Sequence, residues 1–88
     1  MSYKIVILPS ARKAMEELGK RDRVRVDEKI VSLAENPRPH GAIALKGTGR
    51  SLWRLRVGDY RILYKIEDDR LLVIIVDVGN RRDVYRGL

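Results

Sequence analysis

The dipeptide Gly58-Asp59, which separates two apolar-rich runs, constrains the fold of this chain more than any other feature. Leu52–Val57 and Tyr60–Glu67 alternate as half-buried strands do, and a two-residue connection that contains glycine is typical of a tight β-hairpin. A third run, Arg70–Val78, follows after only Asp68-Asp69 and ends in continuous aliphatic residues. Such a run is typical of a strand buried on both faces. The second half of the chain therefore predicts an antiparallel meander.

The first half of the chain predicts a strand followed by two helices. Tyr3–Leu8 is apolar-rich and ends at a proline. Helices are expected over Ser10–Leu18 and Asp22–Glu35, each starting at a residue suited to an N-cap. Apolar residues at helical spacing are Ala11, Ala14, Met15 and Leu18 in the first and Val26, Ile30, Leu33 and Ala34 in the second. With a short strand at Ala42–Leu45, the predicted class is α+β: strand, helix hairpin, then antiparallel meander.

Length and composition narrow the class further. A chain of 88 residues is expected to form one domain over residues 1–88. The lack of cysteine excludes disulfides and thiolate zinc sites, and it suits a reducing compartment. The N-terminal residues lack a signal-peptide pattern, and no apolar run approaches the ~20 residues of a membrane-spanning helix. We therefore expect a soluble, cytoplasmic protein with no membrane partner.

The charge of the chain points to a polyanionic partner. Nineteen lysines and arginines against 12 acidic residues give a net charge of +7 and a pI near 10.1. The excess is uneven, because four arginines and one acid lie between Arg50 and Arg61, whereas charges nearly balance between Asp22 and Glu35. A small basic protein can simply be soluble, but this distribution favours contact with nucleic acid or the ribosome.

Placing Gly58-Asp59 in a two-residue loop sets the register of the predicted hairpin. Arg56 then lies directly opposite Arg61, and Arg54 and Lys65 share their face of the sheet, because side chains alternate along a strand. Like charges directly opposite each other across two strands are destabilising. The pattern favours a bound anion between the arginines, although an ordinary solvent-facing sheet would place arginines in the same way.

Other conspicuous residues have ordinary interpretations. Trp53, Tyr60 and Tyr64 alternate with aliphatic residues and are expected in the core. His40 is expected in an exposed loop, and a single histidine supports neither a metal site nor a histidine-pair nuclease. Gly47-Thr48-Gly49 is too short for a phosphate-binding loop of the nucleotide-binding type. We therefore expect no metal and no cofactor.

The segment Gly79–Tyr85 is the strongest functional signal. It places Arg81, Arg82 and Tyr85 directly after a buried strand, where a rigid scaffold commonly presents functional side chains. Arginine holds negative charge and tyrosine can transfer a proton, so a substrate of this segment should carry phosphate. Tyr85 could instead anchor the chain end by packing.

Several motifs resemble the RelE/ParE toxin superfamily, and within it the RelE-type messenger-RNA interferases. The resemblance covers nearly the whole chain and is carried by Asn36-Pro37-Arg38, Leu45-Lys46-Gly47, Trp53-Arg54-Leu55-Arg56, Gly58–Tyr64 and Val78–Tyr85. It implies a RelE-like fold, in which a curved antiparallel sheet carries the two N-terminal helices. It also implies a toxin of a type II toxin–antitoxin system that cleaves messenger RNA in the ribosomal A site and is held inactive in a hetero-oligomer with its antitoxin.

The resemblance implies a set of site residues as well. The family's catalytic arginine falls on Arg61, its post-strand arginine on Arg81 and its C-terminal tyrosine on Tyr85. Two basic residues of its central hairpin strand fall on Arg54 and Arg56. The residues expected to contact RNA, outside the catalytic set of Arg61, Arg81, Tyr85 and Arg54, are Arg56, Lys46, Arg50, Lys65 and Arg82. One departure is Leu52, which stands where some members carry a lysine; Lys46 or Arg50 would have to supply that charge.

The hypothesis is cleavage by the 2′-hydroxyl of the RNA itself, which leaves a 2′,3′-cyclic phosphate and a 5′-hydroxyl. Tyr85 would be the general base, with its phenolate form favoured by the surrounding cations. Arg61 and Arg54 would hold the phosphate, and Arg81 would stabilise the leaving oxygen. Such a site depends on the ribosome to orient the messenger. Two other functions stay open: a ParE-like inhibitor of DNA gyrase, and a catalytically degenerate member that binds RNA or ribosomes without cutting.

Overall fold

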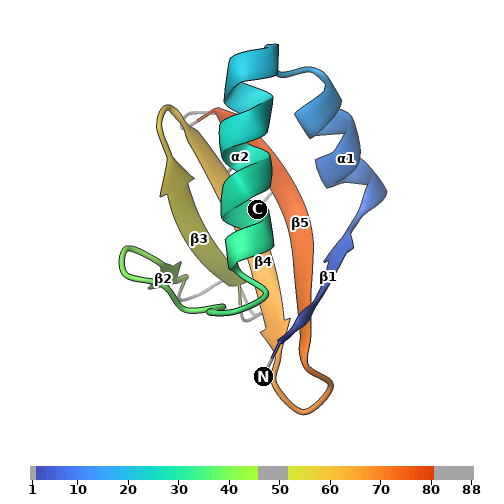
Figure 1. Cartoon of the computed structure of the whole chain (residues 1–88), viewed down its shortest axis with the longest axis vertical. Helices are drawn as coiled ribbons and strands as arrows, with labels where there is room; N and C mark the ends of the chain where they lie inside the picture. Colours follow the sequence, from blue (N-terminus) through green and yellow to red (C-terminus); the bar gives the residue numbers. More distant parts are fainter. Residues whose placement is uncertain (1, 46–51, 81–88) are drawn as a thin grey trace.

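The computed structural model describes residues 2–45 and 52–80 of the chain. Within them the elements are, in chain order, β1 (Lys4–Ile7), α1 (Pro9–Glu16), α2 (Lys20–Ser32), β2 (Ile43–Ala44), β3 (Leu52–Val57), β4 (Tyr60–Glu67) and β5 (Leu72–Asn80). The strands form one sheet in the order β1-β5-β4-β3-β2, with the helices in front of it (Figure 1). The predicted α+β class is confirmed.

The sheet is mixed rather than wholly antiparallel. β3, β4 and β5 form the predicted antiparallel meander, and β2 adds to it antiparallel to β3. β1 instead pairs parallel with β5, with Lys4 opposite Leu72 and Ile7 opposite Ile75. A parallel pair needs a long crossover connection, and here the chain passes through both helices and the other strands before it returns.

The meander has the predicted hairpin at one end and a different turn at the other. β3 and β4 have the predicted bounds, and Gly58 takes a φ of +58° as the first central residue of their turn. The prediction of a two-residue turn at Asp68-Asp69 is wrong. The chain instead makes a four-residue connection that ends at Leu71, which takes a φ of +52°, a conformation that glycine adopts more readily.

Both predicted N-caps are wrong. α1 begins at Pro9, whose fixed φ suits the first turn of a helix. The Ser10 hydroxyl donates instead to the Val76 carbonyl over 2.9 Å. α2 begins at Lys20 after Gly19, so Asp22 lies inside its first turn, where a carboxylate is favoured by the helix dipole. Asp22 also accepts a hydrogen bond from the Tyr60 hydroxyl at 3.3 Å, which ties α2 to the start of β4.

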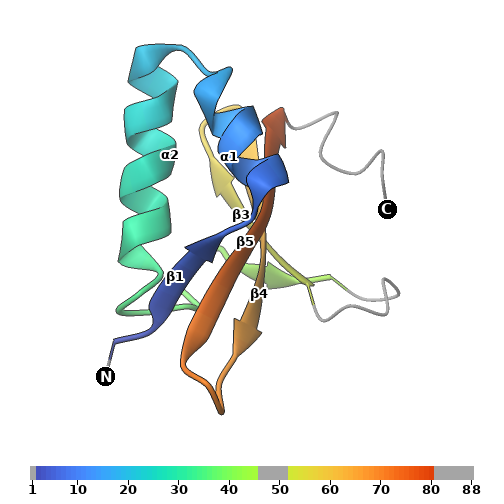
Figure 2. The same ribbon diagram turned by 90° about the vertical axis from the view of Figure 1, so that its right-hand side faces the viewer.

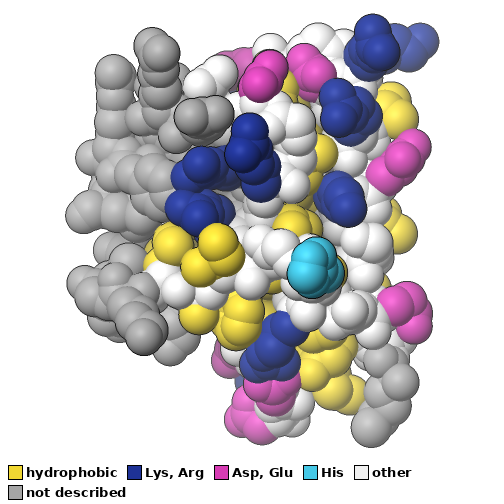
Figure 3. Space-filling view, turned by 90° about the vertical axis from the view of Figure 1, so that its left-hand side faces the viewer, with side chains coloured by type: hydrophobic (Ala, Val, Ile, Leu, Met, Phe, Trp, Pro, Cys, Tyr) yellow, Lys and Arg dark blue, Asp and Glu magenta, His cyan; other side chains and the backbone are white. Residues whose placement is uncertain are grey.

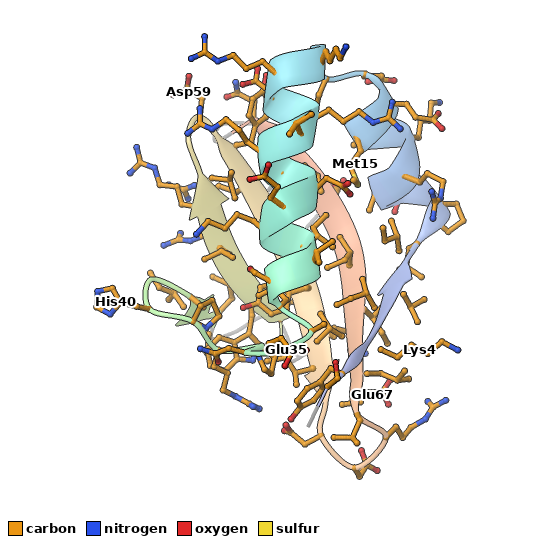
Figure 4. All side chains as sticks on the ribbon, in the orientation of Figure 1. Lys4, Met15, Glu35, His40, Asp59 and Glu67 are labelled. Carbon is orange, nitrogen blue, oxygen red and sulfur yellow. The ribbon has the colours of Figure 1, made fainter. Side chains whose placement is uncertain are left out.

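Both helices pack on one face of the sheet, and the core lies between the two layers (Figures 1 and 2). Met15 of α1 points toward α2, whereas His40 projects from the loop before β2 (Figure 4). The expected core assignment of Trp53, Tyr60 and Tyr64 is confirmed, with Tyr64 fully buried and the other two packed against the core. Buried members of the core are Ala11, Met15, Val26, Ile30, Leu33, Leu55, Val57, Ile62, Tyr64, Val73, Ile75 and Val78.

A β-bulge in β5 shifts its pairing with β4 by one residue. Leu63 pairs with Asp77 but Tyr64 pairs with Ile75, so Val76 is the extra residue, and its carbonyl is the acceptor for Ser10. The bulge keeps Val78 in the core and lets Asp77 lie opposite Leu63. In the described part of the chain, no helix is long and apolar enough to span a bilayer.

Candidate functional site

The register of β3 and β4 brings four basic residues onto the sheet face that the helices leave uncovered. Arg56 lies directly opposite Arg61, and Arg54 lies opposite Leu63. Lys65, two residues beyond Leu63, continues the same face. This register is the predicted one. We call Arg54, Arg56, Arg61 and Lys65 the cationic face.

The cationic face is partly shielded from water. Leu52 and Leu63 lie among its residues and are each only 1% exposed. Arg54 and Arg61 are half-buried, and the Nε atom of Arg61 is shielded from solvent. Electrostatic interactions strengthen where water is excluded, so these guanidinium groups would interact more strongly with a bound anion than solvated ones.

β5 completes this face. Gly79 lies directly opposite Arg61, so no side chain of β5 covers that position. Asp77 lies opposite Leu63, and its Oδ1 accepts a hydrogen bond from the Val78 backbone N–H at 2.9 Å. The strand ends at Asn80, which pairs with Tyr60 beside the β3–β4 turn. Of the other residues expected in the site, Lys46, Arg50, Arg81, Arg82 and Tyr85 lie outside the described residues.

Arg56 also belongs to a second feature, a groove between α2 and β3. The groove has a volume of about 390 Å³ and is lined by Arg25, Glu28, Lys29 and Ser32 of α2 and by Arg56 and Gly58 of the hairpin. We call it the α2–β3 groove. On the face of the molecule that carries this strand edge, Lys and Arg side chains gather above the single histidine (Figure 3).

Sequence reasoning missed Arg25 and Lys29 as members of a basic surface. The charges between Asp22 and Glu35 nearly balance along the chain, but a helix sorts them onto different faces. The available signal was the i, i+4 spacing of Arg25 and Lys29, which places both cations on one side of α2.

A second missed cluster joins three distant segments. Arg38 donates two hydrogen bonds to Asp68, at 3.1 and 2.8 Å, and Tyr3 donates a third to the same carboxylate at 2.6 Å. The Arg38 guanidinium also lies over the ring of Trp53, 5.4 Å from its centroid. These bonds lower the pKa of Asp68 to about 2, mainly through Arg38 and then Tyr3. The cluster is structural, because it ties the loop after α2 to Tyr3, the residue before β1, and to the β4–β5 turn.

Within residues 2–45 and 52–80, no three His, Asp or Glu side chains gather in a way that could hold a metal ion. Asp59 and Glu67 lie at opposite ends of β4, too far apart to act as a carboxylate pair (Figure 4). The chemistry that the described site offers is therefore cation-based recognition of an anion.

Comparisons with known proteins point in one direction. A family model described as the ParE toxin of the type II toxin–antitoxin system, parDE, matches residues 5–85. The chain is 31% identical over 88 residues to the mRNA interferase toxin RelE of Escherichia coli, covering 97% of this chain and 92% of that protein. It is also 31% identical over 87 residues to the toxin RelG of Mycobacterium tuberculosis, covering 98% and 99%.

Solved structures agree in fold. The archaeal RelE–RelB complex from Pyrococcus horikoshii matches with a TM-score of 0.82 at 31% identity, covering 94% of this chain and 99% of that one. The toxin–antitoxin complex RelBE2 from Mycobacterium tuberculosis matches with a TM-score of 0.82 at 27% identity, covering 92% and 100%.

Proposed function

Because this chain belongs to the RelE/ParE superfamily of type II toxin–antitoxin toxins, we propose that it is an endoribonuclease that cleaves messenger RNA in the ribosomal A site and so inhibits translation. The observation that carries the proposal is the cationic face, where Arg54 and Arg61 are half-buried on the side of the sheet away from the helices. Guanidinium groups from two neighbouring strands can together hold the oxygens of one phosphodiester. The relatives named as mRNA interferases support the nuclease over the other functions of the superfamily.

The reaction proposed is attack of the RNA 2′-oxygen on the adjacent phosphorus. The 2′-oxygen forms a new bond to phosphorus and loses its proton, the bond to the 5′-oxygen breaks, and that oxygen takes up a proton. The products are a 2′,3′-cyclic phosphate and a 5′-hydroxyl, so water is not a reactant in the cleavage step, and we propose that no metal ion takes part. Arg61 and Arg54 would hold the non-bridging oxygens and stabilise the charge that develops on them.

Tyr85 and Arg81 would supply the remaining roles, the base and the group on the leaving side. Arg81 follows Asn80 directly, and Asn80 pairs with Tyr60, the neighbour of Arg61. Because consecutive Cα atoms are ~3.8 Å apart, the chain permits Arg81 to approach Arg61, and Tyr85 is only five residues beyond Asn80. This set lacks a strong general acid, since arginine is a poor proton donor. We therefore propose that the ribosome orients the messenger, which compensates for weak acid–base groups.

The partner that would control such a toxin is an antitoxin protein. The two solved structures compared above are complexes of a RelE toxin with its antitoxin. We propose that this chain forms an inactive hetero-oligomer of the same kind, and that its free form acts on ribosomes and messenger RNA in the cytoplasm.

The test is brief expression of the native chain and of Arg61→Ala, Arg81→Ala and Tyr85→Phe, followed by mapping of 5′ ends in cellular messenger RNA. The native chain should produce new 5′-hydroxyl ends in translated messages and stop growth, and each variant should lose both effects by at least about a hundredfold, as expected for loss of a catalytic acid–base or charge-stabilising group. Arg12→Ala, at an exposed position of α1, is the matched control and should behave as the native chain. Full toxicity of Tyr85→Phe and Arg81→Ala together would refute the nuclease assignment.

One observation supports a second function, because the matching family model is described as a ParE toxin. A ParE-like inhibitor of DNA gyrase would induce DNA damage and leave messenger RNA intact. A degenerate member would bind ribosomes without producing 5′-hydroxyl ends, an outcome that Leu52 makes relevant, because its buried side chain offers no charge to the site. The same expression experiment separates the three functions.

A further inference from the structure

The α2–β3 groove gathers cations from two elements that are far apart in sequence. Arg25 and Lys29 lie one turn apart on α2, and Arg56 comes from the edge of β3. All three side chains are exposed, so their charges face the space of about 390 Å³ between the helix and the hairpin. This surface is distinct from the proposed scissile-phosphate site, although Arg56 is common to both.

Two of these guanidinium groups meet at one residue, Gly58. Arg56 donates from Nε to the Gly58 carbonyl over 3.3 Å. The two terminal nitrogens of Arg25 lie 3.4 Å from the position that a Cβ atom on Gly58 would occupy. Two guanidinium groups therefore lie close to a residue that has no side chain.

Among the described residues, no ion pair offsets this concentration of charge. The ion pairs found within residues 2–45 and 52–80 are Arg38–Asp68 and Arg70–Glu67, neither of which is in the groove. Glu28 lines the groove but, in this part of the chain, makes no ion pair with its cations within 4.0 Å. Like charges brought together repel, and a bound anion would remove that repulsion.

We propose that the α2–β3 groove binds the sugar–phosphate backbone of RNA outside the scissile nucleotide. Guanidinium groups match phosphate with two parallel hydrogen bonds, and phosphate contacts of this kind position a nucleic acid without reading its sequence. β2 pairs only with Trp53 and Arg54, so β3 is a strand edge at Arg56 in the described sheet. A backbone held on the cationic face can therefore continue around that edge through Arg56 into the groove.

The lining of the groove favours RNA over an acidic protein partner. Protein interfaces have an apolar, well-packed centre surrounded by a polar rim. Here the remaining apolar residue is Val57, which is already buried in the core, and the exposed lining is charged or polar. Binding by this surface should be electrostatic and nearly independent of sequence.

This inference rests on the proposed function only in taking RNA as the bound molecule. It is tested by measuring RNA binding, not RNA cleavage. The probe is a short single-stranded 2′-O-methyl RNA, which keeps the phosphates but cannot be cut through its 2′-oxygen. Its dissociation constant is measured over a series of KCl concentrations for the native chain, for Arg25→Ala/Lys29→Ala and for Arg12→Ala/Lys13→Ala. The last variant removes the same charge from exposed positions of α1 and is the matched control.

We expect Arg25→Ala/Lys29→Ala to weaken RNA binding about tenfold and to lower the slope of log K against log salt by about 2, one for each lost phosphate contact. The control should change affinity by less than about twofold, because only the overall charge differs. The charge-conserving variant Arg25→Lys/Lys29→Arg should keep most of the affinity. Thermal unfolding of all variants checks that the fold is intact.

The same variants are then measured for binding to ribosomes. A loss for both the probe RNA and ribosomes supports a groove that takes any RNA backbone, including the messenger, whereas a loss for ribosomes alone supports ribosomal RNA as the source. Equal affinities of the groove variant and the control for both would overturn the proposal. So would weakened antitoxin binding with unchanged RNA binding. If Tyr85→Phe stays toxic while the groove variant loses RNA, the nuclease assignment fails and the groove stands.

Discussion

Arg56 and Arg61 lie directly opposite each other across β3 and β4. They form the second residue pair from the hairpin turn, after Val57 and Tyr60. Opposed side chains in an antiparallel sheet have Cβ atoms only ~5 Å apart, so the two cations repel each other in the free protein. The Nε of Arg56 donates a hydrogen bond to the Gly58 carbonyl over 3.3 Å. We therefore expect this pair to lower the stability of the free protein at the place where RNA binding is proposed.

Arg56→Gln should stabilise the free protein while it weakens RNA binding. Removing one of two opposed like charges should raise the free energy of unfolding by roughly 0.2–1 kcal/mol at low ionic strength. The gain should shrink at high salt, because salt screens exposed charges. Urea denaturation at low and high ionic strength measures the gain in unfolding free energy and its dependence on salt. Arg12→Gln on α1 is the control, and an equal gain in the two variants would mean that net charge, not the cross-strand pair, is responsible.

Asp68 should make stability depend on pH in the acid range. Arg38 and Tyr3 lower its pKa from 3.8 to about 2, so the folded state binds its proton later than the unfolded state does. The resulting stability is present above about pH 4 and is lost as the pH falls toward about 2. The effect should be small, because the Arg38 and Asp68 side chains are 44% and 55% exposed and such pairs are weak.

Asp68→Asn removes this dependence, whereas Asp69→Asn in the same turn should leave it unchanged, since its side chain is exposed and outside the Arg38 cluster. The measurement is the urea midpoint of the native chain and both variants across that acid range. A native-like acid dependence in Asp68→Asn would show that other carboxylates cause it.

Tyr64 should make stability fall in alkali. Its side chain is fully buried, its hydroxyl donates to the Pro37 carbonyl over 2.8 Å, and burial raises its pKa from 10.0 to about 12. Above about pH 10 the unfolded state loses this proton first, so stability falls as the pH rises toward 12, by about 1.4 kcal/mol at about pH 11.

Tyr64→Phe should be less stable than the native chain at neutral pH by about 1 to 2 kcal/mol, because the Pro37 carbonyl loses its buried donor. The difference should narrow as the pH approaches about 11, since phenylalanine cannot ionise. Denaturation curves at several pH values give the difference directly. A gap that stays constant with pH would contradict the assignment of the alkaline loss to Tyr64.

Local patterns were sufficient for the hairpin and for the arginines on it. Both bounds of β3 and β4 followed from alternation and from the glycine in the turn, and the turn length alone fixed Arg56 opposite Arg61. Contacts between distant segments were not accessible in this way. The parallel pairing of Lys4 with Leu72 joins β1 and β5, which are far apart in the sequence. A short apolar run such as Lys4–Ile7 does not indicate which strand it will pair with.

The errors at helix starts have the same origin. Ser10 and Asp22 are good N-caps in isolation, but their side chains bond to Val76 and Tyr60, which are more than thirty residues away. Arg25 is a comparable case at the site, because its role depends on the approach of α2 to Gly58. The sequence therefore predicted the basic residues that the β3–β4 hairpin brings together. It did not predict Arg25 and Lys29, which join them only through the packing of α2 on the sheet.

Gly58 connects the hairpin, the cationic face and the groove, so its replacement is a stringent test. Its φ of +58° is one that L side chains rarely adopt, and Gly58→Ala should cost about 1–2 kcal/mol of unfolding free energy. The new Cβ would lie 3.4 Å from the Arg25 nitrogens, a contact that the flexible side chain can relieve, so most of the cost is conformational.

Asp59→Ala is the control, because Asp59 occupies the other central position of the same turn with a negative φ and should cost less than about 0.5 kcal/mol. Urea denaturation measures both variants. Because the two-residue turn sets the register that opposes Arg56 and Arg61, Gly58→Ala should also weaken RNA binding more than Asp59→Ala does. Equal stability of the two variants would mean that another part of the sheet, and not this turn, holds the arginines in register.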